Sequence, residues 1–490
     1  MSNKKYVCLI QPHTSYKLAT TQPALFDTFD SIGLLALAAY LDKYGYEVEV
    51  LHLAKAYRNG YSRKQIENKL LSHKPVLFAI TNMWLHLSVG TIETAQLLRE
   101  LYGEIPIVVG GQHASFFAKD IVKGYCPLID GVIVGEGEET LYEIVKSVED
   151  NGFIDKSIPG FMSYTEEDGI SYTPRRITIK MDDLPFASHK YVWPVIQPIK
   201  GDIIPYVAAL DTVRGGCPNG CGHCLEANYI GQLGRGVRDF HSPEWLIEQL
   251  KHYLRDGKRT IVIQDSFYAN GDEPISKFVD LALKENIQTE AIHFFIEPGY
   301  TSSNIFKVLE QFPAKKVAID YGIETGSIKV AKNMNRFHDF NRIYRDVEVL
   351  GATNTLSTAW WLIGLPGETE EDVKMTEAAI KETTRMGVFT ERVSQMLLFP
   401  QSKIYQEREK YEIEAFFHNY DDFKIFSLIE RRENGLYPEL VTHEMPYQTK
   451  EDTIRMLRKL KKSVRSFTEQ SPYYKRMMKM GFELNDFDFF

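Results

Sequence analysis

The sequence lacks the features that mark a membrane protein, a secreted protein or a nucleic-acid binder. Its longest convincing apolar run, residues 32–41, falls far short of the roughly 20 residues that a helix needs to span a bilayer. The opening MSNKKYVCLIQ holds an apolar run of strand length only, so no signal peptide is expected. The formal net charge of -9 shows no basic excess. We therefore expect a cytoplasmic protein with no membrane span and no nucleic-acid partner.

Cysteine is scarce, with five residues in a chain of 490, which excludes a disulfide framework. Cys8 lies in a strand-like run and Cys126 precedes a proline, so both are expected to pack rather than to bind a ligand. The chain also has no G-x-x-x-x-G-K-S/T loop and no good G-x-G-x-x-G fingerprint after its first strand, which argues against a mononucleotide or NAD site. The other three cysteines lie within eight residues, a spacing that indicates metal binding.

The chain is long enough for two or three domains, and its patterns predict an α/β protein. Over residues 1–150, short apolar runs such as YVCLIQ, VLFAIT and PIVVGG alternate with helical patterns such as IGLLALAAYLDKYG. This alternation implies βαβ units with helices on both faces of a mostly parallel sheet. We predict a Rossmann-like domain there, followed over 151–200 by a hairpin and an extended linker.

The alternation returns over residues 201–400, where six βα units predict a partial or full barrel with its site at the carboxyl ends of the strands. Residues 401–490 are predicted to form a mainly helical cap. Its run TKEDTIRMLRKLKKSVRSF has an apolar stripe at helical spacing, and Thr449 is a plausible N-cap.

The cysteine cluster reads VRGGCPNGCGHCLEAN, so three thiolates can converge from one glycine-rich loop. Zinc is the first alternative, but a closed structural zinc site needs four ligands and the chain has no second cysteine pair. His223 abuts the last cysteine and is poorly placed to bind the same ion. A four-iron cluster with one open iron suits three ligands better, and the predicted ligands are Cys217, Cys221 and Cys224.

This Cys-x3-Cys-x2-Cys loop, after the first strand of a repeated βα region, resembles the radical S-adenosylmethionine (SAM) superfamily. In that family an aromatic residue usually precedes the third cysteine, where this sequence has His223. The resemblance implies that the open iron binds the amino and carboxylate groups of SAM. It also implies that one electron from the cluster cleaves SAM to a 5′-deoxyadenosyl radical, which abstracts hydrogen from the substrate.

Two later turns, GLPGET and DYGIETGS, resemble strand ends that approach SAM in the same superfamily. Asp265 follows the strand TIVI and is expected either to contact the cofactor or to cap a helix. The segment HFFIEPGY departs from the family pattern, so Glu297 receives no assigned role. The SAM-binding residues that the resemblance implies are Asp265, Glu324, Thr325, Gly326, Gly364, Pro366 and Gly367.

The N-terminal patterns resemble those of cobalamin-binding radical SAM enzymes through DSIGLLALAAYL, VVGGQHAS and VGEGEETL. The Asp-x-His-x-x-Gly sequence that supplies a lower ligand in other cobalamin proteins is absent. Trp84 or His86 could lie against the lower face of the corrin, although packing is the simpler interpretation. The resemblance implies cobalamin-binding residues Ser31, Gly33, Gly110, Gly111, His113, Gly135 and Glu136.

The function implied is that of a C-methyltransferase that uses a [4Fe–4S] cluster, SAM and cobalamin. One SAM would methylate the corrinoid and a second would supply the radical that activates an unreactive carbon of a small-molecule, lipid or peptide substrate. Such an enzyme needs an electron donor such as flavodoxin or ferredoxin. No Ser–His–Asp arrangement is required, because the cofactors carry the chemistry.

Three alternatives stay open. A non-methylating reaction, such as cyclisation, ring rearrangement or carbon–carbon bond formation, would use the same cofactors. A methylthiotransferase is disfavoured, because such enzymes usually carry a second cysteine set and only Cys8 and Cys126 are available. A non-catalytic cobalamin or metal sensor is disfavoured by the intact cysteine loop and the GLPGET turn.

Overall fold

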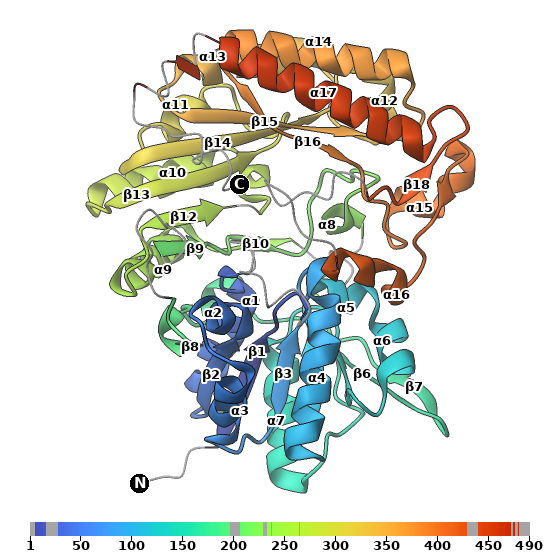
Figure 1. Ribbon diagram of the computed structural model, residues 1–490. Helices are drawn as coiled ribbons and strands as arrows, with labels where there is room; N and C mark the ends of the chain where they lie inside the picture. The colour runs from blue at the N-terminus through green and yellow to red at the C-terminus, as the bar shows by residue number, and fades with distance from the viewer. Residues whose placement is uncertain are drawn as a thin grey trace.

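The computed structural model describes residues 5–15, 28–196, 206–228, 233–236, 238–263, 265–428 and 440–471, together with residues 474, 475 and 479. Parts of the predicted linker and of the predicted cap therefore lie outside the described residues. Within the described ranges the chain forms two main sheets with helices around them, one above the other in Figure 1. The predicted α/β fold class is confirmed.

The first sheet has the strand order β7-β6-β5-β4-β3-β1-β2-β8. Strands β1 to β5 run parallel, β8 pairs parallel with β2, and the β6–β7 hairpin joins the other edge antiparallel to β5. The predicted hairpin and part of the predicted linker thus extend the N-terminal sheet at its two edges. The strands are β1 (Tyr6–Gln11), β2 (Glu47–His52), β3 (Phe78–Thr81), β4 (Ile107–Gly110), β5 (Gly131–Ile133), β6 (Phe161–Thr165), β7 (Gly169–Tyr172) and β8 (Val192–Trp193).

Helices cover both faces of this sheet, as a doubly wound α/β fold requires. Two of them, α1 (Ile32–Lys43) and α7 (Glu138–Asn151), pack on one face through the cluster that contains Leu35 and Ile144. The others pack on the opposite face, where Cys8 lies 1% exposed in the core, as its strand-like run predicts. They are α2 (Leu53–Arg58), α3 (Arg63–Leu71), α4 (Ser88–Tyr102), α5 (Gln112–Phe116) and α6 (Ala118–Tyr125).

The second sheet has six parallel strands in the order β16-β15-β14-β13-β12-β9. This order is that of a partial (β/α)6 barrel, as predicted. The strands are β9 (Val207–Ala209), β12 (Thr260–Ile263), β13 (Thr289–Ile296), β14 (Ala314–Glu324), β15 (Leu356–Ile363) and β16 (Phe389–Gln395). The main outer helices are α9 (Pro243–Arg255), α10 (Asp272–Lys284), α11 (Ile305–Leu309), α12 (Ile328–Asn333), α13 (Phe340–Ala352) and α14 (Glu370–Met386).

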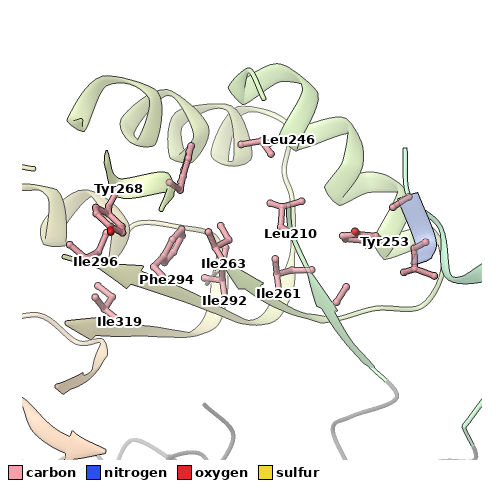
Figure 2. Packing of buried hydrophobic residues seen from close by; sticks show 14 of the residues in the cluster. Leu210, Leu246, Tyr253, Ile261, Ile263, Tyr268, Ile292, Phe294, Ile296 and Ile319 are labelled. Atoms are coloured by element: carbon pink, nitrogen blue, oxygen red, sulfur yellow. The ribbon is translucent and has the colours of Figure 1, made fainter. Parts of the chain in front are cut away.

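Alternation along the barrel strands decides which side chains face outward. Figure 2 shows Ile261 and Ile263 of β12 and Ile292 and Phe294 of β13 packed beneath α9 and α10, where Leu246 of α9 meets them. Because successive side chains of a strand point to opposite faces, the intervening residues face the barrel interior.

The C-terminal residues pack in two places. Helix α17 (Lys450–Gln470) lies against α14 and β16 as a further outer helix, and Thr449 caps it as predicted, in a capping box with Asp452. By contrast, α16 (Tyr420–Phe423) packs on the N-terminal domain, where the Tyr420 hydroxyl accepts a hydrogen bond of 2.6 Å from Asn82 Nδ2. The C-terminal region thus ties the two sheets together as well as completing the barrel wall. The domain boundaries near 150, 200 and 400 stay predictions.

Candidate functional site

A cavity of about 650 Å³ lies between the carboxyl ends of the two sheets, and both contribute to its wall. Small-molecule sites commonly have volumes of roughly 300–1,000 Å³. Parallel α/β sheets and barrels bind ligands beyond the carboxyl ends of their strands, so this position is the expected one for both domains. All three cysteines of the loop line the cavity: Cys217, Cys221 and Cys224.

The cysteine loop runs from β10 (Val213–Arg214) to α8 (Leu225–Asn228). Backbone hydrogen bonds hold it between two neighbours: Gly222 N donates to Met334 O at 2.8 Å, and Ile404 N donates to Gly222 O at 3.0 Å. Burial raises the pKa of Cys221 to about 12 and that of Cys224 to about 11, so the cofactor-free protein holds them as thiols. Binding of iron would displace those protons.

The donor set fits a four-iron cluster, because three thiols from one fixed loop face a single cavity. Two side chains from elsewhere in the barrel approach the sulfur atoms. The Tyr268 hydroxyl lies 3.5 Å from Cys217 Sγ, and Arg336 Nη1 donates to Cys221 Sγ at 3.6 Å. Hydrogen bonds to the sulfurs are among the means by which a protein tunes such a cluster.

Arg336 also holds two buried carboxyls of the cavity wall. Its Nη2 lies 2.6 Å from Glu297 Oε2 and its Nη1 lies 3.8 Å from Glu324 Oε1. Burial raises the pKa of Glu297, and it raises that of Glu324 to about 7, although Arg336 opposes both shifts. Burial alone would lower the pKa of Arg336, but the two carboxyls raise it well above its usual value. Arg336 is therefore a cation that two buried carboxyls share beside the cysteine loop.

Asp265 lines the same cavity and is held by neighbouring donors. It accepts hydrogen bonds from Thr212 N at 2.6 Å, from the Thr212 hydroxyl, and from Phe267 N at 3.2 Å at the start of a short 3-10 turn. Burial raises its pKa to about 7, with Asp211 adding to the shift. The N-cap residue of that turn is Ser266, so Asp265 is not its cap, although Asp265 accepts a hydrogen bond from the turn and lies on the cavity wall. Its contact with SAM stays a prediction.

The other SAM-site predictions fall into two groups. Glu324 lines the cavity, with a left-handed φ of 71°. Thr325 and Gly326 turn toward α14 instead: Gly326 N donates to Thr376 Oγ1 at 3.0 Å, and a Cβ on Gly326 would stand 2.6 Å from Met375 O. The remaining three of that set, Gly364, Pro366 and Gly367, are likewise not among the described residues that line the cavity.

The GLPGET turn is held by contacts from the C-terminal region and from α12. His443 Nε2 lies 2.8 Å from Gly364 O, and the side chain of Asn333 donates to Pro366 O at 2.8 Å. Inside the turn, Glu368 Oε2 accepts hydrogen bonds from Gly364 N at 2.7 Å and Leu365 N at 3.3 Å. The acid of this turn therefore stabilises its backbone, and a SAM-binding role for Gly364, Pro366 and Gly367 stays a prediction.

Most of the predicted cobalamin residues lie together on the N-terminal side of the cavity. Ser31, which precedes α1, makes no N-cap hydrogen bond with its side chain. Gly135 has φ 85°, and a Cβ there would lie 2.9 Å from Leu233 O, so only glycine suits that close approach. These strand ends fit a large planar cofactor laid across them. The predicted residues that line the cavity are Ser31, Gly33, Gly110, Gly111, Gly135 and Glu136.

His113 and the two residues considered for the lower face are placed differently. His113 is 2% exposed, and its ring packs against Phe117 and Tyr420 in the core beside α16. Trp84 lines the cavity and is 53% exposed, whereas His86 is buried and is not among the described lining residues. Of the two residues considered for the lower face, only Trp84 is among the described lining residues of the cavity, and the cobalamin contacts stay predictions.

Glu136 joins the two domains through buried arginines. Its carboxylate lies 2.6 Å from Arg235 Nη2 and 3.1 Å from Arg214 Nη1, and Arg214 also reaches Glu138 at 2.7 Å. Burial would raise the pKa of Glu136, but hydrogen bonds from Arg235 and the charge of Arg214 hold it below its usual value. Because Arg214 immediately precedes the cysteine loop, this network fixes the loop against the N-terminal strand ends.

Sequence reasoning missed Arg336, Arg214, Arg235 and Tyr268. Tyr268 follows Asp265 by three residues in one strand-end loop, so its place near the cavity could have been inferred. Arg336 lies beyond α12, and nothing in its local pattern separates it from a solvent-exposed arginine. Its role depends on contacts with Cys221 and Glu297, which are distant in sequence.

Comparisons with known proteins agree with this architecture. The B12 binding domain model matches residues 26–145, and the radical SAM superfamily model matches residues 213–380. The chain is 26% identical over 303 residues to an uncharacterized methyltransferase of Pyrococcus horikoshii, covering 60% of this chain and 61% of that protein. It is 23% identical over 354 residues to an anaerobic magnesium-protoporphyrin IX monomethyl ester cyclase of Rubrivivax gelatinosus, covering 69% of this chain and 60% of that protein. The chain thus spans about three fifths of these relatives.

Among solved structures, the radical SAM methyltransferase TsrM from Kitasatospora setae, with cobalamin and a [4Fe–4S] cluster bound, superposes with a TM-score of 0.67. Sequence identity is 15%, and the match covers 95% of this chain and 89% of that one, so the two share a fold. A B12-binding domain followed by a radical SAM domain defines the class. This chain contains both domains in the order that cobalamin-binding radical SAM enzymes have, and the two domain families imply a [4Fe–4S] cluster, SAM and cobalamin as its cofactors. No helix in the described part of the chain is long and apolar enough to cross a membrane.

Proposed function

We propose that this chain is a C-methyltransferase that acts on an unactivated carbon of a small-molecule, lipid or peptide substrate. The observation that carries the proposal is the shared cavity, since the cysteine loop and the strand ends of the B12-binding domain line one space. The similarity to a methyltransferase of Pyrococcus horikoshii supports it. When bound together, the cofactors supply a substrate radical and a methyl group for that radical to receive.

The protein's own part is to hold and orient. Cys217, Cys221 and Cys224 anchor the cluster, and the arginine network of Glu136 keeps the cysteine loop facing the N-terminal strand ends. The cavity wall is largely apolar, which suits radical chemistry because water is kept from the reacting centre. Each turnover would need two electrons, one to cleave SAM and one to return the corrinoid to the state that SAM methylates. As a second part of the proposal, both would come from a flavodoxin or a ferredoxin.

The coproducts of SAM test this proposal without prior identification of the product. Each methylation consumes one SAM as methyl donor, which leaves S-adenosylhomocysteine, and a second SAM that is reduced to methionine and 5′-deoxyadenosine. Protein loaded anaerobically with cluster and cobalamin, and given SAM, reductant and candidate substrates, should therefore release both coproducts in equal amounts. Omitting cobalamin should abolish S-adenosylhomocysteine, and failure to cleave SAM at all would contradict the enzyme assignment.

A non-methylating radical reaction is the second candidate function. The relative from Rubrivivax gelatinosus, named as a cyclase, favours it. In that case 5′-deoxyadenosine should accumulate with the substrate while S-adenosylhomocysteine stays at the level of the substrate-free control. The same assay therefore separates the two candidates.

A further inference from the structure

The barrel side of the cavity has an aromatic wall that the cofactor sites do not explain. On β13, Phe294 points outward beneath the helices (Figure 2), so Phe295 points into the barrel, where it lines the cavity. On β15, Trp361 is buried in the outer core and Trp360 lines the cavity. The two inward rings lie 5.2 Å apart between centroids, inclined at 45°.

A glycine on the strand between them lies directly beneath one of these rings. Gly322 of β14 pairs with Trp360 in the parallel register. A Cβ at Gly322 would stand 2.8 Å from Glu297 Oε1 and 3.2 Å from Phe295 Cζ. Glycine at this position therefore leaves room for Glu297 and the ring of Phe295 to lie directly over the strand. We call Phe295, Gly322 and Trp360 the aromatic shelf.

The charges around the shelf are mostly negative. Five carboxyls of the radical domain line the cavity, whereas its only described lining cations are Arg214 and Arg336. Both arginines are already paired, Arg214 with Asp211 at 2.8 Å and Arg336 with Glu297 at 2.6 Å. An anionic substrate would therefore find no unpaired cation among the described lining residues, whereas a neutral or cationic substrate needs none. The five carboxyls are Asp211, Glu226, Asp265, Glu297 and Glu324.

We propose that the aromatic shelf binds a planar aromatic group of the substrate, and that the part of the substrate inside the barrel is neutral or cationic. Stacking on Phe295 and Trp360 would orient the group, and a nearby positive charge would be favoured by the ring faces and the carboxyls. This inference rests on the proposed function and narrows its substrate class. It disfavours phosphorylated lipids and other polyanions.

Three probes that share the indole ring system but differ in net charge test the proposal. They are tryptamine (cationic), indole (neutral) and indole-3-acetate (anionic). Their binding to the full chain, loaded with cluster, cobalamin and SAM, can be followed by calorimetry. Ligands of about ten heavy atoms can reach millimolar affinity or better. We expect tryptamine and indole to bind, and indole-3-acetate to bind about tenfold more weakly or not at all. Equal binding of all three, or binding of none, would overturn the proposal.

Variants then locate the binding. Trp360→Leu should weaken tryptamine binding about tenfold, and Trp360→Phe, which keeps a ring and protects against a folding defect, should weaken it less. Trp245→Leu is the matched control, because Trp245 stacks on His241 outside the lining of this cavity. If Trp360→Leu instead weakens SAM binding and leaves tryptamine unaffected, the shelf holds the adenine of SAM and the inference is wrong. These binding results do not depend on whether S-adenosylhomocysteine is formed, so the proposed function can fail separately.

Discussion

Glu368 shows how a motif residue can serve the fold rather than the ligand. It is completely buried in the GLPGET turn, where it accepts the backbone hydrogen bonds of Gly364 and Leu365. Burial raises its pKa from 4.5 to about 8, with Asp372 contributing. A carboxyl that stays protonated to such a high pH makes the stability of the protein depend on pH.

The sign of that dependence follows from proton linkage. Between pH 4.5 and about 8 the folded state holds a proton on Glu368 that the unfolded state has lost, so its contribution to stability is present below pH 4.5 and is lost as pH rises toward 8. Relative to Glu368→Gln, the free energy of unfolding of the cofactor-free wild type should fall by about 1.4 kcal/mol per pH unit in this window. Urea unfolding of both proteins at several pH values between the two pKa values, 4.5 and about 8, measures it. Burial lowers the pKa of the nearby His443 to about 4, and because both proteins contain this residue, we expect its effect to cancel. If the free energies of unfolding of the two proteins depend on pH in the same way, the assignment of the raised pKa to Glu368 is wrong.

The cysteines give a second residue-level prediction. Cys221→Ser should lose the cluster, seen as loss of bound iron and of the visible absorbance after anaerobic reconstitution, because two thiolates hold it poorly. Cys126→Ser is the control, since Cys126 Sγ donates to Tyr164 O at 3.2 Å in the N-terminal domain. Full iron content in Cys221→Ser, or loss of iron in the control, would contradict the ligand assignment.

Single residues were predictable where a short local sequence pattern indicates them. The three cysteines and the glycines at strand ends are of this kind. Arg336 and Glu297 were not, because their significance comes from one ion pair of 2.6 Å between strand β13's end and the loop after α12. The family resemblance implied that Gly326 lies near SAM, which stays a prediction; the structure shows that its missing side chain lets the loop pack against α14.

At the level of elements, the contacts of Glu136 with Arg214 and Arg235, which we call the Glu136 network, join the loop between β5 and α7 to strand β10. Glu136→Gln should lower the free energy of unfolding by about 3 kcal/mol, because it leaves buried guanidinium groups without their shared anion. Glu143→Gln is the matched control on α7, where Glu143 pairs with Arg175 at a 41% exposed position and should cost less than about 1 kcal/mol. Chemical denaturation compares them, and equal losses would mean that the network does not hold the domains.

The sequence pattern predicted the main strands and helices because apolar periodicity is a local property. It did not reveal that β8 pairs with β2, that the β6–β7 hairpin continues the sheet, or that α16 packs on the N-terminal domain. Each of these depends on a partner far away in the chain. The same reason explains why α17, correctly expected as an amphipathic helix, could not be placed against α14 and β16 beforehand.

For the whole molecule, the arrangement of the two sheets matters more than either domain alone. The carboxyl strand ends of each sheet face the other sheet, so residues predicted for both cofactor sites line one cavity of about 650 Å³. Buried contacts of Glu136 with Arg214 and Arg235, and of Tyr420 with Asn82, hold this arrangement. On the proposed function, cofactors bound at both predicted sites would meet one substrate without a large domain movement.

Magnetic resonance of the doubly loaded protein tests this central claim most directly. After anaerobic reconstitution and reduction, the paramagnetic corrinoid and the reduced [4Fe–4S] cluster should both be present on one chain. Because they face one cavity, their electron spins should interact, which would appear as altered relaxation or splitting of the corrinoid signal compared with Cys221→Ser protein that carries only the corrinoid. A corrinoid signal unchanged by the reduced cluster, or a cluster-loaded protein that retains no corrinoid, would contradict the account.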